Sequence, residues 1–454
     1  MTNSFLALFP AGCGFAAASS RLFAAFVFLF PLSASAQQSW TLEHCIDHAL
    51  KHNISIRQRE NVQRQQALQL STARSQRLPD LNASASQNFS FGRGLTAENT
   101  YTNTNTSSTS FSLGTSIPLL TGNRLPKTVE LNRLNLEAST QDLEHARNDI
   151  SVQVAQQFVQ VLYAQEISDV ARSQVSLDSI QVARMEALLS VGRASEADVE
   201  QQRASLAQAR LSATQADGNV RLALLTLTQL LELPSPDGFT IESTAAAASS
   251  SALPTPDAIY AEAVLVRPEI KAEHLRLSGT DASIAIARSS LYPTLSFSAG
   301  LGSNYYKTSG FRADAFGTQL KNNFSQYLGF NLSIPIFNRF QIRNNIRSAK
   351  IDRENQQLAL DNAEKQLYKE IQTAYYNTVN AQEKLQSSLA ACQSSEAAFK
   401  LVKAKYEVGK ATPTEYAQAR NNLLKAESDL VQARYEYLYQ TALIQFYRGQ
   451  PLHF

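Results

Sequence analysis

Three histidines near the start of the chain have the spacing of metal ligands. His44, His48 and His52 follow one another at intervals of four residues, which places them on one face of a helix, with Cys45 beside the first. Imidazole and thiolate groups at such a spacing can bind zinc or copper. A solvated helix face produces the same pattern, with Ile46, Ala49 and Leu50 on the opposite side. Both interpretations stay open, and no cofactor is assigned.

Two carboxylates stand at matching places in the two halves of the chain. Asp198 and Glu415 each lie six residues after a glycine, Gly192 and Gly409 respectively. A turn between antiparallel helices needs a residue that tolerates positive φ, and glycine does so. Acidic side chains also stabilise the first turn of a helix through its dipole. The pattern therefore predicts two helix–turn–helix connections, each with an acid at the start of its second helix.

These motifs belong to a duplication of about half the molecule. Ser116-Ile117-Pro118-Leu119 returns as Ser333-Ile334-Pro335-Ile336, and Val191-Gly192 returns as Val408-Gly409, in both cases 217 residues later. Each copy has the pattern of a helix, two strands, a very long helix, a glycine turn and a shorter helix. Such a repeat is too long for a solenoid unit. We expect a first structural repeat at 37–233, a linker in an equatorial region at 234–256 and a second repeat at 257–454.

The N-terminal segment has the pattern of an export signal. Arg21 precedes an apolar run at 22–32, and Ala34-Ser35-Ala36 fits a cleavage site, so we expect a signal peptide at 1–36. No later segment has the roughly 18 consecutive apolar residues of a membrane-spanning helix. A membrane could then be crossed only by a closed β-barrel. The net charge of +2 gives no basic footprint for nucleic acid.

Four segments alternate apolar and small polar residues, as strands of an outer-membrane barrel do. They lie at 81–91, 110–119, 294–301 and 328–336, and the last has reversed parity. The polar stretches between them, 92–109 and 307–323, are expected as external loops bordered by aromatic residues. Bacterial barrels have at least about eight strands, so several copies of the chain must associate. The alternative is a half-buried sheet in a soluble sandwich.

Two segments, 127–191 and 336–408, contain neither glycine nor proline and predict very long helices. At 1.5 Å per residue, such helices reach about 100 Å. A shorter helix follows each, with apolar residues at heptad spacing from Val199 to Leu227 and from Tyr416 to Ile444, and a second seam rich in alanine. This predicts long antiparallel hairpins. Further helix is expected before the strands, at 42–78 and 269–292, with less of it in the second half.

The ordered set of motifs resembles the TolC-like outer membrane efflux proteins. It comprises Tyr292-Pro293-Thr294-Leu295 at a strand entry, Ile334-Pro335-Ile336-Phe337 at a strand exit, Arg267-Pro268-Glu269-Ile270, and Tyr406-Glu407-Val408-Gly409. The resemblance implies a mainly α chain with membrane β-strands, assembling as a homotrimer whose 12-stranded barrel continues into a periplasmic helical tube. It also implies the outer membrane of a Gram-negative bacterium. The implied partners are outer membrane lipid, a periplasmic adaptor protein and an inner-membrane efflux pump.

The resemblance also assigns roles to the two helix–turn–helix tips. In the family these tips form the closed aperture and the adaptor contact. The aperture falls on Glu415 and its counterpart Asp198, and Gln418 stands where a second acid is expected. Three copies of Glu415 would form a negative ring that favours cations. The matching tip and adaptor positions are Val191, Gly192, Arg193, Tyr406, Val408, Gly409 and Lys410.

The leading hypothesis is a passive export duct for small molecules. Type I protein secretion would use the same tube and stays open as an alternative. A periplasmic coiled-coil scaffold without a pore is an alternative of another class, although a scaffold needs neither the strands nor the aromatic residues. No phosphate loop, nucleophile elbow or paired-acid site stands out, so we expect no enzyme and no cofactor. Cys45 and Cys392 are expected as inert, unpaired side chains.

Overall fold

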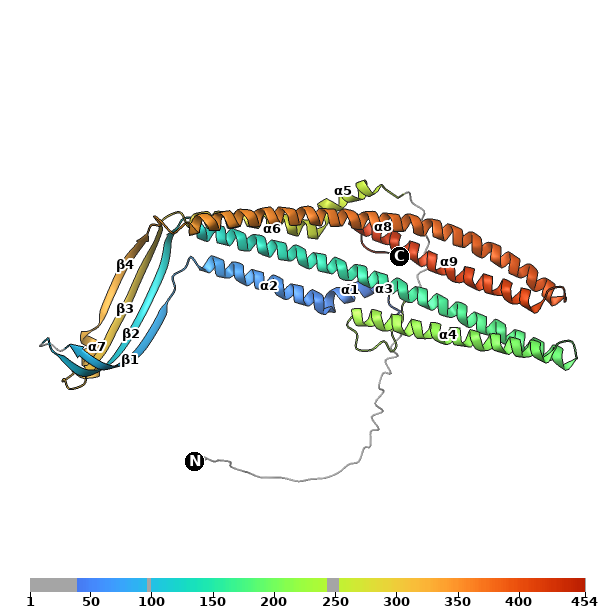
Figure 1. The fold of residues 1–454 in the computed structure, drawn as a ribbon, viewed down its shortest axis with the longest axis horizontal. Coiled ribbons are helices and arrows are strands. Elements are labelled where there is room, and N and C mark those ends of the chain that lie inside the picture. Colours follow the sequence, from blue (N-terminus) through green and yellow to red (C-terminus); the bar gives the residue numbers. More distant parts are fainter. Residues whose placement is uncertain (1–38, 96–98, 243–252, 454) are drawn as a thin grey trace, which may run out of the picture. The chain divides into compact units, whose positions relative to one another are not determined.

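The two halves of the chain fold into the same order of elements, except for one additional short helix between the strands of the second half. The computed structural model describes residues 39–95, 99–242 and 253–453. These described residues make up one compact unit, built of helices and one four-stranded antiparallel sheet (Figure 1). The expected signal peptide at 1–36 and the middle of the expected linker lie outside the described residues.

The matched helices of the two halves have equal lengths. The first half contains α1 (Leu42–His52), α2 (Ile54–Ser75), β1 (Asn82–Leu95), β2 (Tyr101–Thr121), α3 (Arg124–Ser190) and α4 (Glu196–Leu230). The second contains α5 (Pro256–Val266), α6 (Pro268–Ser289), β3 (Thr294–Thr308), α7 (Phe316–Asn322), β4 (Ser325–Ser333), α8 (Gln341–Glu407) and α9 (Pro413–Tyr447). Both α3 and α8 have 67 residues, and both α4 and α9 have 35.

The expectation of less helix before the strands of the second half is wrong. Helices α5 and α6 have 11 and 22 residues, as α1 and α2 do. Pro256 and Pro268 are the first residues of α5 and α6. Proline is tolerated there because the first N–H of a helix has no partner within the helix. Pro256, which was expected as the last residue of the linker, therefore starts a helix, as Pro268 does.

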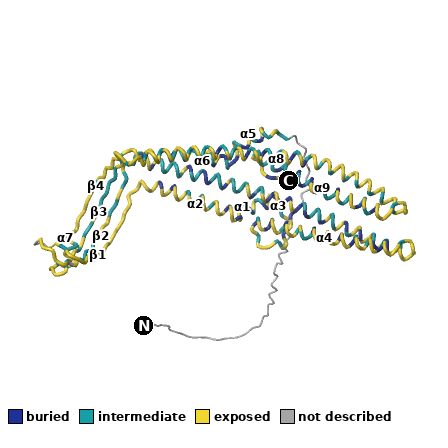
Figure 2. Tube along the Cα trace, in the orientation of Figure 1, coloured by how far each residue is buried: buried dark blue, intermediate teal, exposed yellow. Residues whose placement is uncertain are grey.

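The long helices pair as antiparallel hairpins, α3 with α4 and α8 with α9, and the two hairpins meet where α3 packs against α9. The heptad seams are confirmed: Val199 and Leu227 are fully buried, and Ala209, Ala216 and Ala223 are buried with them. Buried residues follow the faces along which the helices meet (Figure 2).

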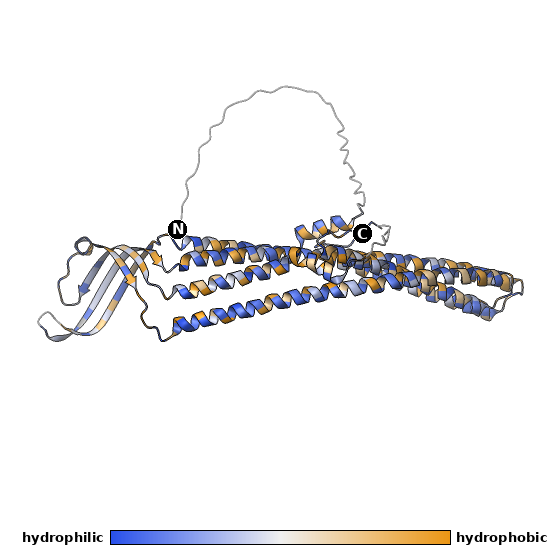
Figure 3. Cartoon of the chain, turned by 90° about the horizontal axis from the view of Figure 1, so that it is seen from above, coloured by the Kyte–Doolittle hydropathy of each residue, from blue (hydrophilic) through white to orange (hydrophobic). Residues whose placement is uncertain are grey.

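The other expectations about the helices concern membranes and cysteines. Polar residues are interspersed with apolar ones along the long helices (Figure 3), and none of the helices in the described ranges is both long and apolar enough to cross a bilayer. Cys45 is buried, Cys392 is half-buried, and both are free thiols. Burial raises the pKa of the Cys45 thiol to about 12, so this side chain stays a neutral packing group.

The strand register confirms the predicted two-faced sheet. The order is β1-β2-β3-β4, and every neighbouring pair is antiparallel. Up to Pro118, even-numbered residues of β2 lie opposite even-numbered residues of β3 and odd opposite odd, so that Leu113 lies beside Leu301. Even-numbered residues of β4 lie opposite odd-numbered residues of β3, which sets Leu328 beside Ala299 and Phe330 beside Phe297. The reversed parity of the last strand therefore keeps its apolar residues on the same face as those of the others.

The predicted loops and strand ends need correction. Most of the polar stretch 92–109 is strand, since β1 runs to Leu95 and β2 begins at Tyr101. Its many threonines are β-branched and favour strands. The stretch 307–323 contains the short helix α7, which the pattern did not indicate. Strand β4 ends at Ser333, two residues before Pro335, which has no N–H for a ladder.

The joint between sheet and long helix is relaxed in one half and strained in the other. Gly122 and Asn123 have φ values of 56° and 69°, and their counterparts Arg339 and Phe340 have 53° and 63°. Glycine adopts positive φ freely and asparagine tolerates it, whereas other residues lose about 1–2 kcal/mol each. The second copy of the joint therefore carries backbone strain that the first copy avoids.

Relieving this strain should stabilise the protein. Arg339→Gly is expected to raise the free energy of unfolding by about 1 kcal/mol, because glycine adopts the observed φ without strain. Thermal unfolding of the purified protein measures the effect. Arg343→Gly, in the first turn of α8, is the matched control and should lower the stability by up to about 1 kcal/mol. A melting temperature that falls equally in both variants would contradict the assignment of strain.

Candidate functional site

The two helix–turn–helix tips lie at the end of the hairpins away from the sheet (Figure 1). Gly192 has φ 71° and Gly409 has φ 74°, as the predicted turns require. In each tip the residue after the glycine closes the turn: the Arg193 N–H donates to the Leu188 carbonyl at 2.8 Å, and the Lys410 N–H to the Lys405 carbonyl at 2.8 Å. This is the Schellman arrangement that ends a helix on glycine. Val191 and Val408 are exposed beside the glycines.

Both candidate acids take part in a capping box. Glu415 accepts hydrogen bonds from the Thr412 backbone N–H at 2.7 Å and from its hydroxyl at 3.0 Å. Asp198 accepts the same pair of bonds from Ser195, at 3.1 and 2.7 Å. In return, the hydroxyl of each capping residue accepts the backbone N–H of the acid. The helix-start role of both acids is therefore seen directly.

These hydrogen bonds also hold the two acids in their charged form. The Thr412 N–H, and then the Thr412 hydroxyl, lower the pKa of the Glu415 carboxyl below its usual value. The Ser195 hydroxyl, and then the Ser195 N–H, lower the pKa of Asp198 in the same way. Both carboxylates are therefore ionised at neutral pH, and of the two Glu415 is exposed and Asp198 is half-buried. A ring of such charges requires further copies of the chain and stays a prediction.

Two other expected site residues face neighbouring side chains. The Tyr406 ring stacks on Tyr416 at 4.7 Å, and the Arg184 guanidinium lies 5.6 Å from the Tyr406 ring centre. Tyr406 is half-buried, so among the expected adaptor-contact residues it lies inward, between α8, α9 and α3. Gln418 is exposed and donates to the Asn422 side-chain oxygen at 3.0 Å.

A buried ion pair that the sequence pattern did not indicate joins the two hairpins. Arg420 on α9 donates to the carboxylate of Asp178 on α3, and their side chains are 10% and 1% exposed. Arg203, the counterpart of Arg420 in the first half, instead pairs with Glu186 and Glu200 on its own hairpin and is 53% exposed. The duplicated arginine has therefore acquired a different, buried partner in the second half.

Polar atoms without a protein partner surround this ion pair. Asp178 Oδ2, Arg420 Nε and Gln174 Nε2 are buried and, within the described part of the chain, form no hydrogen bond. All three residues line a cavity of about 350 Å³ between α3, α4 and α9. Such a polar cavity suits ordered water, which would satisfy these atoms.

The three histidines make ring contacts with Trp40 or with a neighbouring histidine. His44 lies parallel to Trp40 at 4.2 Å, and His48 stacks on His52 at 4.1 Å. Burial, followed by the nearby charges of His52, His44 and Lys51, lowers the pKa of His48. Across the residues that the structure describes, no group of three or more histidine, cysteine or acidic side chains is arranged to hold a metal ion.

The polar face of the sheet consists of uncharged residues, most of them small. Pairing sets Ser84 beside Ser112 and Ser86 beside Ser110, with 2.7 Å between the hydroxyls of each pair. The register places serine, threonine, asparagine, glycine, proline and tyrosine on this face of the four described strands, and none of their charged residues. Water can wet such a face without strongly attracting either sign of charge.

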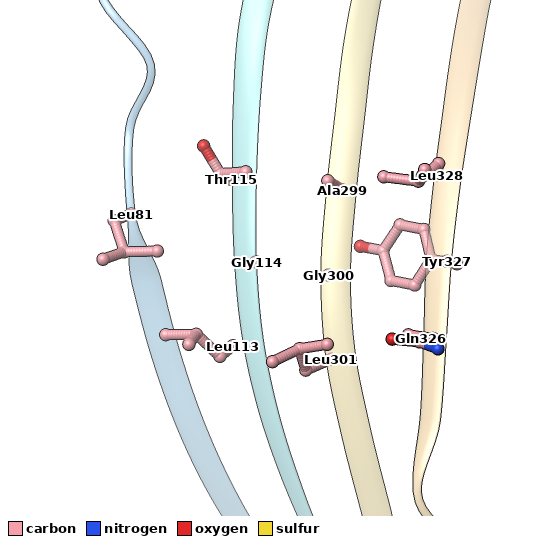
Figure 4. A pocket seen from close by; sticks show the side chains of 10 residues that line it. All are labelled: Leu81, Leu113, Gly114, Thr115, Ala299, Gly300, Leu301, Gln326, Tyr327 and Leu328. Carbon is pink, nitrogen blue, oxygen red and sulfur yellow. The ribbon is translucent and has the colours of Figure 1, made fainter.

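One large side chain, Tyr327, lies flat on this face. Its ring extends from β4 over Gly300 towards Gly114 (Figure 4). A Cβ atom at Gly300 would stand 2.6–2.9 Å from three atoms of the Tyr327 ring and hydroxyl. Gly300 is therefore the residue that allows the ring to lie against the sheet.

A methyl group at this position should displace the ring. Gly300→Ala is expected to lower the free energy of unfolding by about 1 kcal/mol, the low end for overpacking, because the ring can swing away but loses its packing. In a Tyr327→Ala background the same change should have no further effect on the melting temperature. Gly329→Ala is the matched control, since its Cβ would meet only the Ser298 hydroxyl at 3.5 Å. Equal losses from Gly300→Ala with and without Tyr327 would contradict this account.

Comparison with known proteins places this architecture in a family. Residues 45–232 and 259–449 match the family described as outer membrane efflux protein. The chain belongs to this family. It is similar to the outer membrane efflux protein BepC of Brucella suis biovar 1, with 22% identity over 409 residues, 89% of this chain and 84% of that protein. It is also similar to the pyoverdine export outer membrane protein OpmQ of Pseudomonas aeruginosa, with 28% identity over 311 residues, 66% of this chain and 61% of that protein.

Solved structures confirm the fold of this outer membrane efflux protein. The Campylobacter jejuni outer membrane channel CmeC aligns with a TM-score of 0.74 and 22% identity, over 91% of this chain and 87% of that one. CusC aligns with a TM-score of 0.74 and 20% identity, over 90% and 91%. The resemblance to TolC-like proteins, the mainly helical fold with membrane strands and the outer-membrane location are thereby confirmed.

Proposed function

We propose that this outer membrane efflux protein is the passive export duct of a tripartite efflux system and carries small molecules to the exterior. The observation that carries the proposal is the two-faced sheet joined directly to the long hairpins. One face is apolar and suits lipid, and the other is polar and uncharged and suits a water-filled path. The chain acts in this proposal as a conduit, without an enzymatic activity or a cofactor.

The duct would be a homotrimer. Strands β1 and β4 are the two edges of the sheet, and each has one neighbour within the described chain. Three four-stranded sheets joined edge to edge would close a 12-stranded barrel, and their hairpins would continue as a helical tube. Two long, exposed strand edges favour such pairing, because each carries a row of backbone hydrogen-bonding groups.

The tips would face the rest of the efflux system. A periplasmic adaptor would contact the exposed residues next to the tip glycines, including Val191 and Val408, and connect the duct to an inner-membrane pump. Exposed Glu415 and half-buried Asp198 are both charged at the same end, which supports a place for them at a cation-favouring aperture. Gln418 would add polarity there without charge.

Dye efflux in the native host tests this function. Deletion of the gene is expected to raise the retained amount of a small fluorescent pump substrate, and the intact chain should restore efflux. Val191→Asp with Val408→Asp is the matched variant, because it leaves the sheet unchanged and should reach the outer membrane without restoring efflux. Unchanged dye retention, with loss of a secreted protein from the medium, would instead support type I protein secretion. Extraction of the chain without detergent would support a scaffold without a pore.

A further inference from the structure

The apolar face of the sheet carries cations only at the end away from the helices. Lys307 follows the apolar row Leu295, Phe297, Ala299 and Leu301 on the same face of β3. It lies opposite Ser107 of β2, which in turn lies opposite Phe89 of β1. An outer-membrane strand crosses the apolar layer in about 10 residues. Lys307 therefore lies about where the bilayer gives way to headgroups and water.

The connection after Lys307 is held in a fixed shape by hydrogen bonds. Strand pairing between β3 and β4 ends at Gly302 and Ser325. Beyond this point the Gln319 side chain takes the place of a neighbouring strand: it accepts the Tyr306 N–H at 2.9 Å and donates to the Tyr306 carbonyl at 3.0 Å. The Asn323 side chain also donates to the Asn304 carbonyl, at 2.7 Å. These bonds fix α7 against the outer part of β3.

Aromatic contacts place α7 on the apolar side of the sheet. The Phe316 ring lies 5.1 Å from Tyr305 and 6.5 Å from Phe111, two residues of the apolar face. Phe311, Phe316 and Phe324 are 52%, 46% and 56% exposed. Exposed aromatic side chains at the edge of an apolar band are typical of the membrane interface.

Three exposed cations accompany these rings. Lys307, Arg312 and Lys321 are exposed, and none forms an ion pair with another described residue. Asp314 is the only acid between residues 307 and 324. Together with Phe311, Phe316 and Phe324, these three cations lie within residues 307–324, around α7, and we call the six residues the basic–aromatic patch.

We propose that the basic–aromatic patch binds phosphate-bearing lipid headgroups of the outer leaflet. The rings would enter the interface, and the cations would pair with the phosphates just above it. A Lys or Arg near an anionic lipid surface contributes about a fivefold gain in binding. The inference rests on the proposed function only in that the sheet crosses the outer membrane. It adds a lipid specificity that a neutral aromatic belt would not have.

Lipid enrichment around the purified protein tests the proposal. The protein is equilibrated in mixed micelles of phosphatidylcholine with a minor fraction of either bisphosphorylated or dephosphorylated lipid A, and retained lipid is measured by mass spectrometry. The wild type should enrich the phosphorylated form. The triple variant Lys307→Gln, Arg312→Gln, Lys321→Gln should lose about fivefold enrichment per charge. Rising salt should weaken the enrichment in the same way.

A matched variant and two further readouts separate the outcomes. Lys365→Gln, Lys369→Gln and Lys400→Gln removes three exposed charges from α8 and should leave enrichment unchanged. Equal enrichment of both lipids, or an unaffected triple variant with an intact fold by circular dichroism, would overturn the proposal. Displacement by inorganic phosphate would show a site for free anions and would also overturn it. Ion conductance, recorded on the same protein, reports separately on the proposed duct.

Discussion

Asp178→Leu is expected to destabilise the protein by about 3–5 kcal/mol, because it leaves the charge of Arg420 buried without its partner. The pair links α3 to α9, and the Asp178 side chain is 1% exposed. Chemical denaturation followed by circular dichroism measures the loss. The ordered water expected in the neighbouring cavity would solvate the guanidinium only in part, so most of the penalty should remain.

Two variants separate loss of the pair from loss of a residue. Asp178→Leu with Arg420→Met should recover most of the stability, since replacing a buried pair by apolar groups is often neutral or stabilising. Arg203→Met removes the exposed counterpart of Arg420 in the first half and should cost less than about 1 kcal/mol. If Asp178→Leu is no more harmful than Arg203→Met, the two hairpins are not held together by this pair.

Glu415→Gln is expected to reduce the preference of the reconstituted duct for cations by about fivefold, the effect of roughly 1 kcal/mol of lost charge interaction. Glutamine can still accept the Thr412 N–H of the capping box, so the helix start is kept while the charge is lost. The reversal potential in a salt gradient measures this preference. Alanine would remove both the charge and the cap, and its effect would be harder to assign.

The pH dependence of this preference follows from the capping bonds. Because these bonds lower the pKa of Glu415 in the folded protein, its charge persists to a pH below the usual carboxyl range, and the stability that depends on that charge is complete above that range. Both are lost only as the pH falls through the lowered folded pKa. Glu383→Gln, which removes an exposed charge from α8 away from the tip, is the control. An unchanged reversal potential in Glu415→Gln would remove Glu415 from the aperture.

Features set by neighbouring residues could be predicted from the sequence. The glycine turns, the heptad seams and the two faces of the strands each depend on spacing along one segment, and the structure confirms them. The stretch 92–109 was predicted as a loop because its serines and threonines are equally typical of a polar loop and of a strand with one solvent-exposed face. Pro256 was assigned to the end of the expected linker, yet it starts α5, because position within a helix decides whether proline is tolerated.

Features that depend on the meeting of distant segments could not be predicted. Asp178 and Arg420 are 242 positions apart and become partners only because α3 packs against α9. The place of α7 similarly depends on where β4 stops pairing with β3. The roles of Glu415, Asp198 and the tip residues depend on other copies and other proteins, so they stay proposals.

Electron cryomicroscopy of the purified protein in lipid nanodiscs tests the central claim most directly. We expect three copies around one axis, with the uncharged strand face and one face of the hairpins lining a continuous water-filled path. A solitary chain in the bilayer, or an axis filled along its length by packed apolar side chains, would contradict the account.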